Sequence, residues 1–533
     1  MAPGWVLKAC VFATGLSGIV AEYVMATMAS YLLGDAVVQW TLVISSMLFA
    51  MGVGSRLSRH VERRLVDTFI VIELVLSLLV AAAPLVVWSL AVRVDYLTLV
   101  IYGLAIAIGV LIGAEIPIAT RINEAYEELR VNISGVIEKD YYGALAGGLI
   151  FAFLALPHLG LTYTPIALGA LNLIVAALLM IAFADRLRYK RWLIGGFGTV
   201  AVALVGLSVT AEPIVQWGEQ GRYRDRVVYQ EQTRYQRIVM TQWRDDHWLY
   251  LDSTLQFSSR DEVVYHESLV RPALGIAARR AEVLVLGGGD GLAIREVLRY
   301  DDVERVTLVD LDPAMTALAR SHPVLVALNE GVLEDPRVEI VHADAYTYIA
   351  DQERMWDVVI IDLPDPKTVS LARLYSVPFY RRVVSRLSPG GVLVTQATSP
   401  YFSRHAFISI WKSVAATGLI AVPYHQHVTT MGEWGWVLGW KPPARGFDVP
   451  SEPVEDLPEL AVAPSDHRVE IEYIRRRLSR LEFADTHFLN RAAMVSMLHF
   501  GKGILDDSDT VTPSGESDLT VYHAYRRGAW DLY

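Results

Sequence analysis

Two hydrophobic patterns divide this chain. Before about residue 212, apolar residues form long runs, each close to the ~20 residues that a helix needs to cross a bilayer. After that point, the apolar runs shorten to the length of strands and alternate with polar segments. The long runs predict a helical membrane domain, residues 1–212, with about seven spans. The predicted spans are 5–33, 36–54, 66–91, 97–119, 141–157, 159–184 and 192–211.

Basic residues follow the second, fourth and sixth predicted spans and bear on orientation. The positive-inside rule places these three connections in the cytoplasm. With an odd number of spans, the rest of the chain then lies outside, whereas a substrate made in the cytoplasm requires the opposite. A miscount of one span removes the conflict, so the sequence leaves the side open. The basic residues are Arg56, Arg59, Arg63, Arg64, Arg121, Arg130, Lys139, Arg186, Arg188, Lys190 and Arg191.

Three acidic residues, Glu22, Glu73 and Glu115, fall within the predicted spans. Carboxylates are costly inside a membrane and usually face a bundle interior or an aqueous path. One interpretation is a path or sensing site for cations. The other is that the acids make interhelical hydrogen bonds or lie nearer the membrane surface, without a role in transport.

The second half of the chain predicts an α/β fold. Residues 213–262 are rich in polar, aromatic and β-branched residues and predict a small antiparallel sheet. From 263 to 441, strands at 283–286, 306–309, 338–341, 358–361 and 392–396 alternate with helices at 263–278, 293–298, 313–320, 377–387 and 405–416. This alternation predicts a parallel sheet covered on both faces. Residues 442–533 are predicted to be a linker, 442–459, and an extension with a helix at 469–481 and a strand at 519–525.

Composition agrees with a membrane domain and excludes some partners. The 533 residues have a mean hydropathy of +0.33, which is high for a soluble protein. A net charge of −11 argues against a nucleic-acid partner. The single cysteine, Cys10, lies in the first predicted span, so disulfides indicate nothing about compartment.

A glycine loop after the strand at 283–286 points to the ligand. Its sequence is Gly287-Gly288-Gly289-Asp290-Gly291. Glycine loops that follow a strand typically bind nucleotides, but a loop that binds phosphate avoids a carboxylate at its apex. Asp290 therefore indicates a ligand with a cationic group, such as an amine or a sulfonium.

Further acids follow successive predicted strands. Asp290, Asp310, Asp344 and Asp362 each come after one strand, and Asp365 lies three residues beyond the last. The carboxyl ends of parallel strands form the edge of the sheet where ligands bind. Any one of these acids is as readily explained as a helix cap. The set as a whole, without a cluster of Lys or Arg beside it, predicts a positively charged ligand.

These motifs, in this order, resemble the polyamine aminopropyltransferases, the spermidine synthase family, over about residues 235–440. The whole chain resembles the membrane-anchored branch of that family. The resemblance implies a Rossmann-like domain, a homodimer, and transfer of an aminopropyl group from decarboxylated S-adenosylmethionine to a diamine, usually putrescine, which releases methylthioadenosine. The matching segments are Tyr235-Gln236, Leu251-Asp252-Ser253-Thr254-Leu255-Gln256, Asp261-Glu262, Tyr265-His266-Glu267, the glycine loop, Val309-Asp310-Leu311-Asp312, and Asp362-x-x-Asp365-Pro366.

The resemblance also implies roles for matching residues. The nucleoside of the donor would be held by Gln236, Gly287, Gly289, Asp310, Asp344 and Ala345, with Asp310 at the ribose and Asp344 and Ala345 at the adenine. Asp290 would bind the aminopropyl ammonium of the donor. The amine channel would be lined by Gln256, Tyr265, His266 and Asp365. Asp362 would orient the attacking amine and accept its proton, since an alkylammonium with a pKa near ~10.4 has no free lone pair. A sulfonium is already a good leaving group, so no metal is expected.

Two departures from the family pattern affect the acceptor side. Leu363 and Pro364 stand where relatives usually have small polar residues, and the loop 429–433 lacks an aromatic residue that many relatives place against the amine. The sequence therefore leaves the acceptor open among putrescine, cadaverine, agmatine and spermidine. Trp434 and Trp436, just beyond that loop, are predicted to be core residues.

Two other classes of function remain. One is a methyltransferase-like enzyme that uses intact S-adenosylmethionine, although the carboxylate of that donor would lie beside Asp290. The other is a membrane polyamine transporter or sensor whose second half only binds a ligand. A transporter of the major-facilitator fold has more than seven spans, so the transporter alternative requires a dimer or a different mechanism.

Overall fold

The computed structural model describes residues 3–33, 36–91, 96–443, 468–501, 503–505 and 508–528. The chain divides into two compact units, Met1–Val227 (the helical unit) and Val228–Tyr533 (the sheet unit). From residue 444 on, the predicted linker lies outside the described residues.

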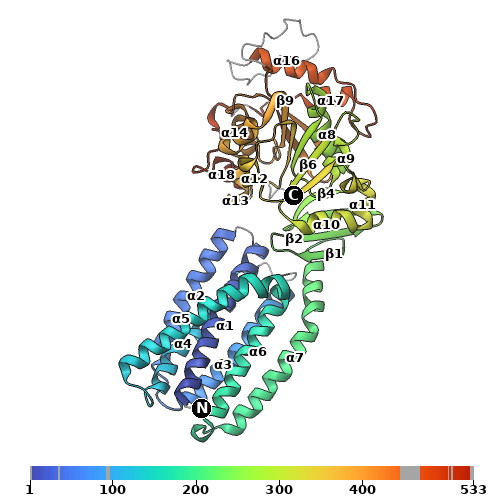
Figure 1. Ribbon diagram of the computed structural model, residues 1–533. Helices are drawn as coiled ribbons and strands as arrows, with labels where there is room; N and C mark the ends of the chain where they lie inside the picture. The colour runs from blue at the N-terminus through green and yellow to red at the C-terminus, as the bar shows by residue number, and fades with distance from the viewer. Residues whose placement is uncertain are drawn as a thin grey trace. The chain divides into compact units, whose positions relative to one another are not determined.

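The helical unit contains seven long helices among its described residues. By length and composition, the described part of the chain has six helical segments that are able to cross a membrane. Helix α1 packs against α2, α4, α5 and α6 (Figure 1). The helices are α1 (Pro3–Leu33), α2 (Ala36–Ser58), α3 (Leu65–Leu90), α4 (Leu97–Asn123), α5 (Leu129–Ile150), α6 (Leu156–Ala182) and α7 (Lys190–Gln220).

Among the described residues, six candidate membrane spans are found instead of the predicted seven because two of the predicted spans lie in one helical segment. A π-helical turn, η1 (Phe151–Ala155), joins α5 to α6 into 54 helical residues, Leu129–Ala182. At ~1.5 Å per residue, this segment is far longer than the ~30 Å core of a bilayer. Gly160, at φ 61° and ψ −169°, breaks it, so both α5 and α6 pack against α1. Helix α5 starts at Leu129, before the start of the predicted span at 141, so Arg130 and Lys139 lie in α5.

The basic connections meet at one end of the helical unit. Arg64 Nη1 donates to Tyr189 Oη at 2.6 Å, which joins the α2–α3 and α6–α7 connections. In the last turn of α4, Arg121 donates to two backbone carbonyls at and just after the end of α2. Helix α7 starts at this end and continues to Gln220, past the predicted boundary at 212.

Glu22, Glu73 and Glu115 are buried inside the helical unit. Both carboxylate oxygens of Glu73 and one of Glu115 have no hydrogen-bond partner among the described residues. Interhelical hydrogen bonding therefore does not account for Glu73 in the part of the chain that the structure describes.

The sheet unit contains the predicted small sheet, which has four strands in the order β1-β2-β3-β4. β2 pairs antiparallel with β3, and β3 with β4. The sheet packs on the core through Ile238, Met240, Leu249 and Phe257, which are almost fully buried. The strands are β1 (Arg226–Gln232), which starts just before the unit boundary, β2 (Arg237–Trp243), β3 (Asp246–Leu251) and β4 (Thr254–Ser258).

The larger sheet has seven strands in the order β10-β11-β9-β8-β5-β6-β7. The five predicted strands are present and parallel: β5 (Glu282–Gly287), β6 (Arg305–Asp310), β7 (Val338–His342), β8 (Trp356–Asp362) and β9 (Leu387–Gln396). β10 (Ile420–Val428) and β11 (Gly432–Trp440) add an antiparallel edge. The apolar residues of β5 and β8 are fully buried, as expected of strands with both faces covered.

Helices cover both faces of the larger sheet (Figure 1). Those that begin at residues 262, 292, 313, 377 and 404 start within one residue of the predicted helices. The helices Pro323–Asn329, Ala345–Asp351 and Val369–Ala372 were not predicted. The helices before the extension are α8 (Glu262–Ile276), α9 (Leu292–Val297), α10 (Pro313–Ser321), α11 (Pro323–Asn329), α12 (Ala345–Asp351), α13 (Val369–Ala372), α14 (Val377–Ser385) and α15 (Arg404–Ala415).

Among its described residues, the C-terminal extension forms three α-helices, α16 (Arg468–Ser479), α17 (Arg491–Met497) and α18 (Thr520–Arg526). α16 confirms the predicted helix at 469–481. The predicted strand at 519–525 is wrong, since these residues lie in α18. Asp518 accepts a hydrogen bond from the backbone N–H of Thr520, and Val521 is buried where α18 packs on α15. Tertiary packing thus overrides the strand preference of the β-branched residues.

Gly287 is the position where the backbone of the sheet is most constrained. It has φ +80°, and a Cβ there would lie 2.1 Å from the carbonyl oxygen of Asp362. Gly331 has a similar φ of +68° but nothing within 4 Å of a Cβ. We expect Gly287→Ala to lower the free energy of unfolding by about 2–5 kcal/mol, and Gly331→Ala by only about 1 kcal/mol. Thermal unfolding of both variants measures this, and equal losses would contradict the role of the close approach.

Candidate functional site

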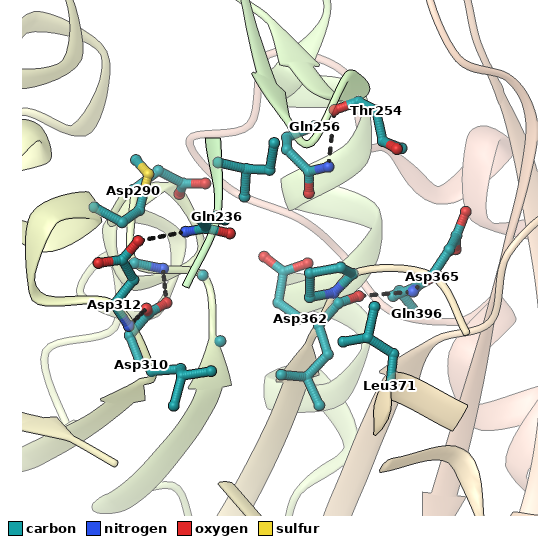
Figure 2. Close-up of a pocket in the computed structure, with 18 of the residues that line it drawn as sticks. Gln236, Thr254, Gln256, Asp290, Asp310, Asp312, Asp362, Asp365, Leu371 and Gln396 are labelled. Atoms are coloured by element: carbon teal, nitrogen blue, oxygen red, sulfur yellow. Dashed lines mark hydrogen bonds between the residues drawn. The ribbon is translucent and has the colours of Figure 1, made fainter. Parts of the chain in front are cut away.

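A cavity of about 390 Å³ opens at the carboxyl ends of β5, β6 and β8. Figure 2 shows Gln236, Asp290 and Asp310 on one side of this cavity and Asp362 and Asp365 on the other. The structure brings all the predicted site residues into its lining: Gln236, Gln256, Tyr265, His266, Gly287, Gly289, Asp290, Asp310, Asp344, Ala345, Asp362 and Asp365.

The glycine loop holds Asp310 at the end of β6. Gly289 N donates to Asp310 Oδ2 at 3.0 Å, and Asp312 N donates to the other carboxylate oxygen at 2.8 Å. A Cβ at position 289 would lie 2.5 Å from Asp310 Oδ2, so this hydrogen bond requires a glycine. Burial raises the pKa of Asp310, and the backbone N–H of Asp312 partly offsets that shift.

Asp312 fixes the side chain of Gln236, a role that the sequence did not indicate. Asp312 Oδ2 accepts from Gln236 Nε2 at 3.0 Å and from Thr233 Oγ1 at 2.7 Å. Its other oxygen accepts from Ala314 N at 3.1 Å and caps α10. The Asp312-Pro313 pair could have indicated the capping role of Asp312, since Asp is a preferred N-cap and Pro a preferred first residue of a helix.

Asp290 and His266 form a pair of opposite charges in the lining. Asp290 Oδ1 accepts from Leu292 N at 2.8 Å at the start of α9. Burial raises the pKa of Asp290 to about 6, although the nearby His266 lowers it. Burial alone would lower the pKa of His266, but its hydrogen bond to Glu262 and the charges of Glu262, Asp290 and Asp362 raise it to about 9. His266 is therefore a cation at neutral pH.

A buried chain of ion pairs maintains this charge on His266. Its Nδ1 lies 2.9 Å from Glu262 Oε2. Arg295 donates to both oxygens of Glu262, at 2.8 and 3.0 Å, and also to Glu296 at 2.9 Å. Arg271 completes the chain with a 2.8 Å hydrogen bond to Glu296. Buried charges of this kind are tolerated because each has a partner of opposite sign.

Asp362 lies at the end of β8 and accepts from Tyr265 Oη at 2.8 Å. Burial raises the pKa of Asp362, while the positive charge of His266 and the hydrogen bond from Tyr265 lower it. Asp365, on the following loop, accepts from Gln396 Nε2 at 3.2 Å and from Tyr525 Oη at 2.9 Å. Burial raises the pKa of Asp365 to about 6 despite these bonds. Asp365 therefore takes up a proton close to neutral pH, and burial makes Asp362 a better proton acceptor than an exposed aspartate.

Asp344 differs from the other acids because its carboxylate is already paired. Asp344 Oδ1 accepts from Thr347 N at 3.1 Å as the N-cap of α12. Its other oxygen forms an ion pair with Arg373. The helix-cap explanation therefore holds for this residue, and its contact with adenine stays a prediction.

The cavity also contains residues that the sequence did not single out. Lys367 lines it and donates from Nζ to Thr254 Oγ1, so one cation lies among the acids on the Gln256 side. Burial lowers the pKa of Lys367, whereas Asp252 and Asp365 raise it. Trp434 and Trp436 belong to the buried core, as predicted, and Trp434, which is 8% exposed, also lines the cavity. It provides an aromatic surface next to a loop that lacks one.

Comparisons with known proteins define the family. The Spermine/spermidine synthase domain matches residues 262–449. Polyamine aminopropyltransferase 2 of Aquifex aeolicus is 43% identical over 438 residues, which cover 82% of this chain and 88% of that protein. Polyamine aminopropyltransferase of Leptospira interrogans is 38% identical, covering 86% and 93%. The solved spermidine synthase from Thermotoga maritima is 24% identical, covering 54% of this chain and 88% of that one, with a TM-score of 0.43.

The chain therefore belongs to the polyamine aminopropyltransferase family of transferases, enzymes of polyamine biosynthesis, as its motifs predicted. The predicted Rossmann-like domain is the part that the spermidine synthase domain matches.

The hydrogen bond between Tyr265 and Asp362 gives a test of the site. We expect Tyr265→Phe to lower kcat about tenfold and to move the acid limb of its pH profile upward by about one unit. The shift is upward because the lost bond favours the charged carboxylate, so Asp362 takes up a proton at a higher pH. Tyr424→Phe is the matched control, since Tyr424 Oη donates to the backbone of Ser268 and does not line the cavity. An unchanged pH profile for Tyr265→Phe would contradict this role.

Proposed function

We propose that the sheet unit transfers an aminopropyl group from decarboxylated S-adenosylmethionine to putrescine, forming spermidine and methylthioadenosine. The observation that carries this proposal is the set of four carboxylates that line one cavity, Asp290, Asp310, Asp362 and Asp365. Asp365 is buried and the other three are half-buried. Neighbouring anions repel one another, and a ligand with ammonium groups relieves that repulsion. The names of the relatives support the same reaction.

The two sides of the cavity fit the two substrates. Asp310, held by backbone N–H groups at the end of β6, suits the ribose hydroxyls of the donor. The half-buried Asp290 in the adjacent glycine loop suits the ammonium of the aminopropyl group. An intact S-adenosylmethionine would bring its own carboxylate towards Asp290, so the decarboxylated donor is favoured.

Asp362 is the residue that we assign to proton transfer. The attacking amine must lose a proton before its lone pair can form the new N–C bond. As that bond forms, the C–S bond breaks and sulfur keeps the electron pair, which leaves neutral methylthioadenosine. Asp362 accepts the proton, and its hydrogen bond to Tyr265 fixes its orientation. The rest of the task is alignment of nitrogen, carbon and sulfur.

The lining favours a diamine as acceptor. Gln256, Asp365 and Trp434 provide polar, anionic and aromatic contacts for an alkylamine. Lys367 places a positive charge in the same lining, and like charges repel. A third ammonium, as in spermidine, is therefore disfavoured relative to the two of putrescine.

Turnover by the purified full-length protein tests the function. We expect decarboxylated S-adenosylmethionine and putrescine to give equal amounts of spermidine and methylthioadenosine. Asp362→Asn should lower kcat at least ~100-fold, because the proton acceptor is lost, with the Kd for methylthioadenosine within about twofold. Product analysis and equilibrium binding measure the two quantities, and simultaneous loss of nucleoside binding would contradict this role for Asp362.

A second substitution separates the donor's ammonium from its nucleoside. We expect Asp290→Asn to weaken binding of the decarboxylated donor about tenfold or more, because a charge-assisted contact is lost, and to leave methylthioadenosine binding nearly unchanged. Asp302→Asn is the control, since its carboxylate pairs with Arg280 and does not line the cavity. Calorimetry with both ligands gives the comparison, and equal weakening of the two by Asp290→Asn would count against the contact.

We also propose that the helical unit anchors the enzyme in a cell membrane as a multi-pass domain. Large apolar side chains point outward from it, and Phe49, Ile181 and Val202 are 74%, 75% and 74% exposed. Helices that are apolar on all sides are stable in lipid but not in water. The resemblance further implies a homodimer, which stays a prediction.

Membrane fractions of cells that express the full chain test this anchoring. We expect the protein to stay in the pellet after an alkaline carbonate wash, and its release into the supernatant would contradict insertion. Protease added to vesicles of known orientation then determines the side on which residues beyond 227 lie. The positive-inside rule places the basic end of the helices in the cytoplasm, so α7 would lead the residues beyond 227 to the outside. The donor is made in the cytoplasm, which favours the opposite orientation.

A further inference from the structure

The C-terminal extension returns to the cavity, although it lies beyond the matched residues 262–449. Hydrogen bonds fix its backbone to the rest of the sheet unit. Ser514 O accepts from Val377 N at 2.8 Å, and Thr512 O accepts from Ser409 Oγ at 2.9 Å. Helix α18, which follows this segment, packs on α13 and α15. The extension is therefore an integral part of the wall behind the cavity.

Tyr525, in the last turn of α18, contacts an acid of the site. Its Oη donates to Asp365 Oδ2 at 2.9 Å, while Gln396 Nε2 donates to Asp365 Oδ1 at 3.2 Å. Figure 2 shows Asp365 and Gln396 side by side at this wall. Tyr525 is not part of the cavity lining, so it acts on a ligand only through Asp365.

We propose that Tyr525 is a positioning residue for the acceptor amine, which it serves by orienting the carboxylate of Asp365 and keeping it ionised. This inference rests on the proposed function of the site. Tyr525 and Gln396 each donate to one oxygen of Asp365, so the orientation of the carboxylate in the cavity is fixed. A fixed anion binds an ammonium with less loss of side-chain freedom than a mobile one.

Electrostatics gives Tyr525 a second effect. Asp365 is almost completely buried, and burial raises its pKa to about 6 even with the hydrogen bond from Tyr525 in place. A hydrogen bond to the charged form lowers the pKa of an acid. Without that bond the pKa of Asp365 rises further, and less of the anion that binds the amine is present near neutral pH.

Tyr525→Phe removes the hydroxyl and keeps the ring that packs in the wall. We expect the KM for putrescine to rise about tenfold, with kcat and the KM for the donor within about twofold of wild type. The acid limb of kcat/KM for putrescine should move upward by about one pH unit. Steady-state kinetics from pH 5 to 9 on the full-length protein measure all three quantities.

Tyr522→Phe is the matched control on the same helix. Tyr522 Oη accepts from Arg526 Nη1 at 3.1 Å, and Tyr522 does not line the cavity. We expect this variant to match wild type in both KM values and in its pH profile. Thermal unfolding of the two tyrosine variants should agree within a few degrees, so that altered kinetics do not reflect partial unfolding.

A double substitution separates positioning from a general structural role. In an Asp365→Asn background, Tyr525→Phe should change the KM for putrescine no further, because the two residues act as one unit. The inference would be overturned if the two substitutions raised the KM for putrescine independently, so that their effects multiplied in the double variant. It would also be overturned if Tyr525→Phe alone raised the KM for the donor equally, or had the kinetics of wild type. Wild-type protein that forms no aminopropylated amine would overturn the proposed function as well. Active wild-type protein with an unaffected Tyr525→Phe variant would overturn the inference alone.

Discussion

The parallel pairing of β5 with β6 and β8 is the constraint on which the site depends. Leu286 is in register with Val309 on one side and with Ile361 on the other, so the three strands end at the same level. Their next residues are therefore neighbours at one edge of the sheet. Gly287 allows the backbone of β5 to approach Asp362 closely. Asp310, the glycine loop and Asp362 then face one cavity, although they are far apart along the chain.

Burial gives these acids their chemistry. Water would stabilise exposed aspartates as anions at ordinary pKa values, whereas the cavity raises the pKa values of Asp290 and Asp365 to about 6. His266 offsets part of the repulsion because Glu262, whose pKa is lowered by His266 and Arg295, keeps its ring charged. Under the proposed function, a ligand with ammonium groups supplies the remaining positive charge. The carboxylates then stay incompletely compensated until the substrate binds.

Local pattern predicted most of the fold, and long-range contacts account for what it missed. The buried strands and the helices between them follow from apolar runs and helical spacing. The two predicted spans 141–157 and 159–184 lie in one helical segment that a π-helical turn joins and Gly160 breaks. Helix α18 forms where a strand was predicted because Val521 packs in the wall. The acids of the cavity were identified from strand ends and family motifs. The pairing of Asp344 with Arg373, and the contact of Tyr525 with Asp365 across 160 residues, have no local signal.

Proton release on binding tests most directly whether incompletely compensated carboxylates bind the substrate. At pH 6, an acid with a pKa of about 6 is half protonated, and it must lose that proton to bind an ammonium. Calorimetry in buffers of different ionisation enthalpy counts the protons released. The account predicts about half a proton more for decarboxylated S-adenosylmethionine than for methylthioadenosine, which lacks the ammonium. Equal proton release for the two ligands would contradict it.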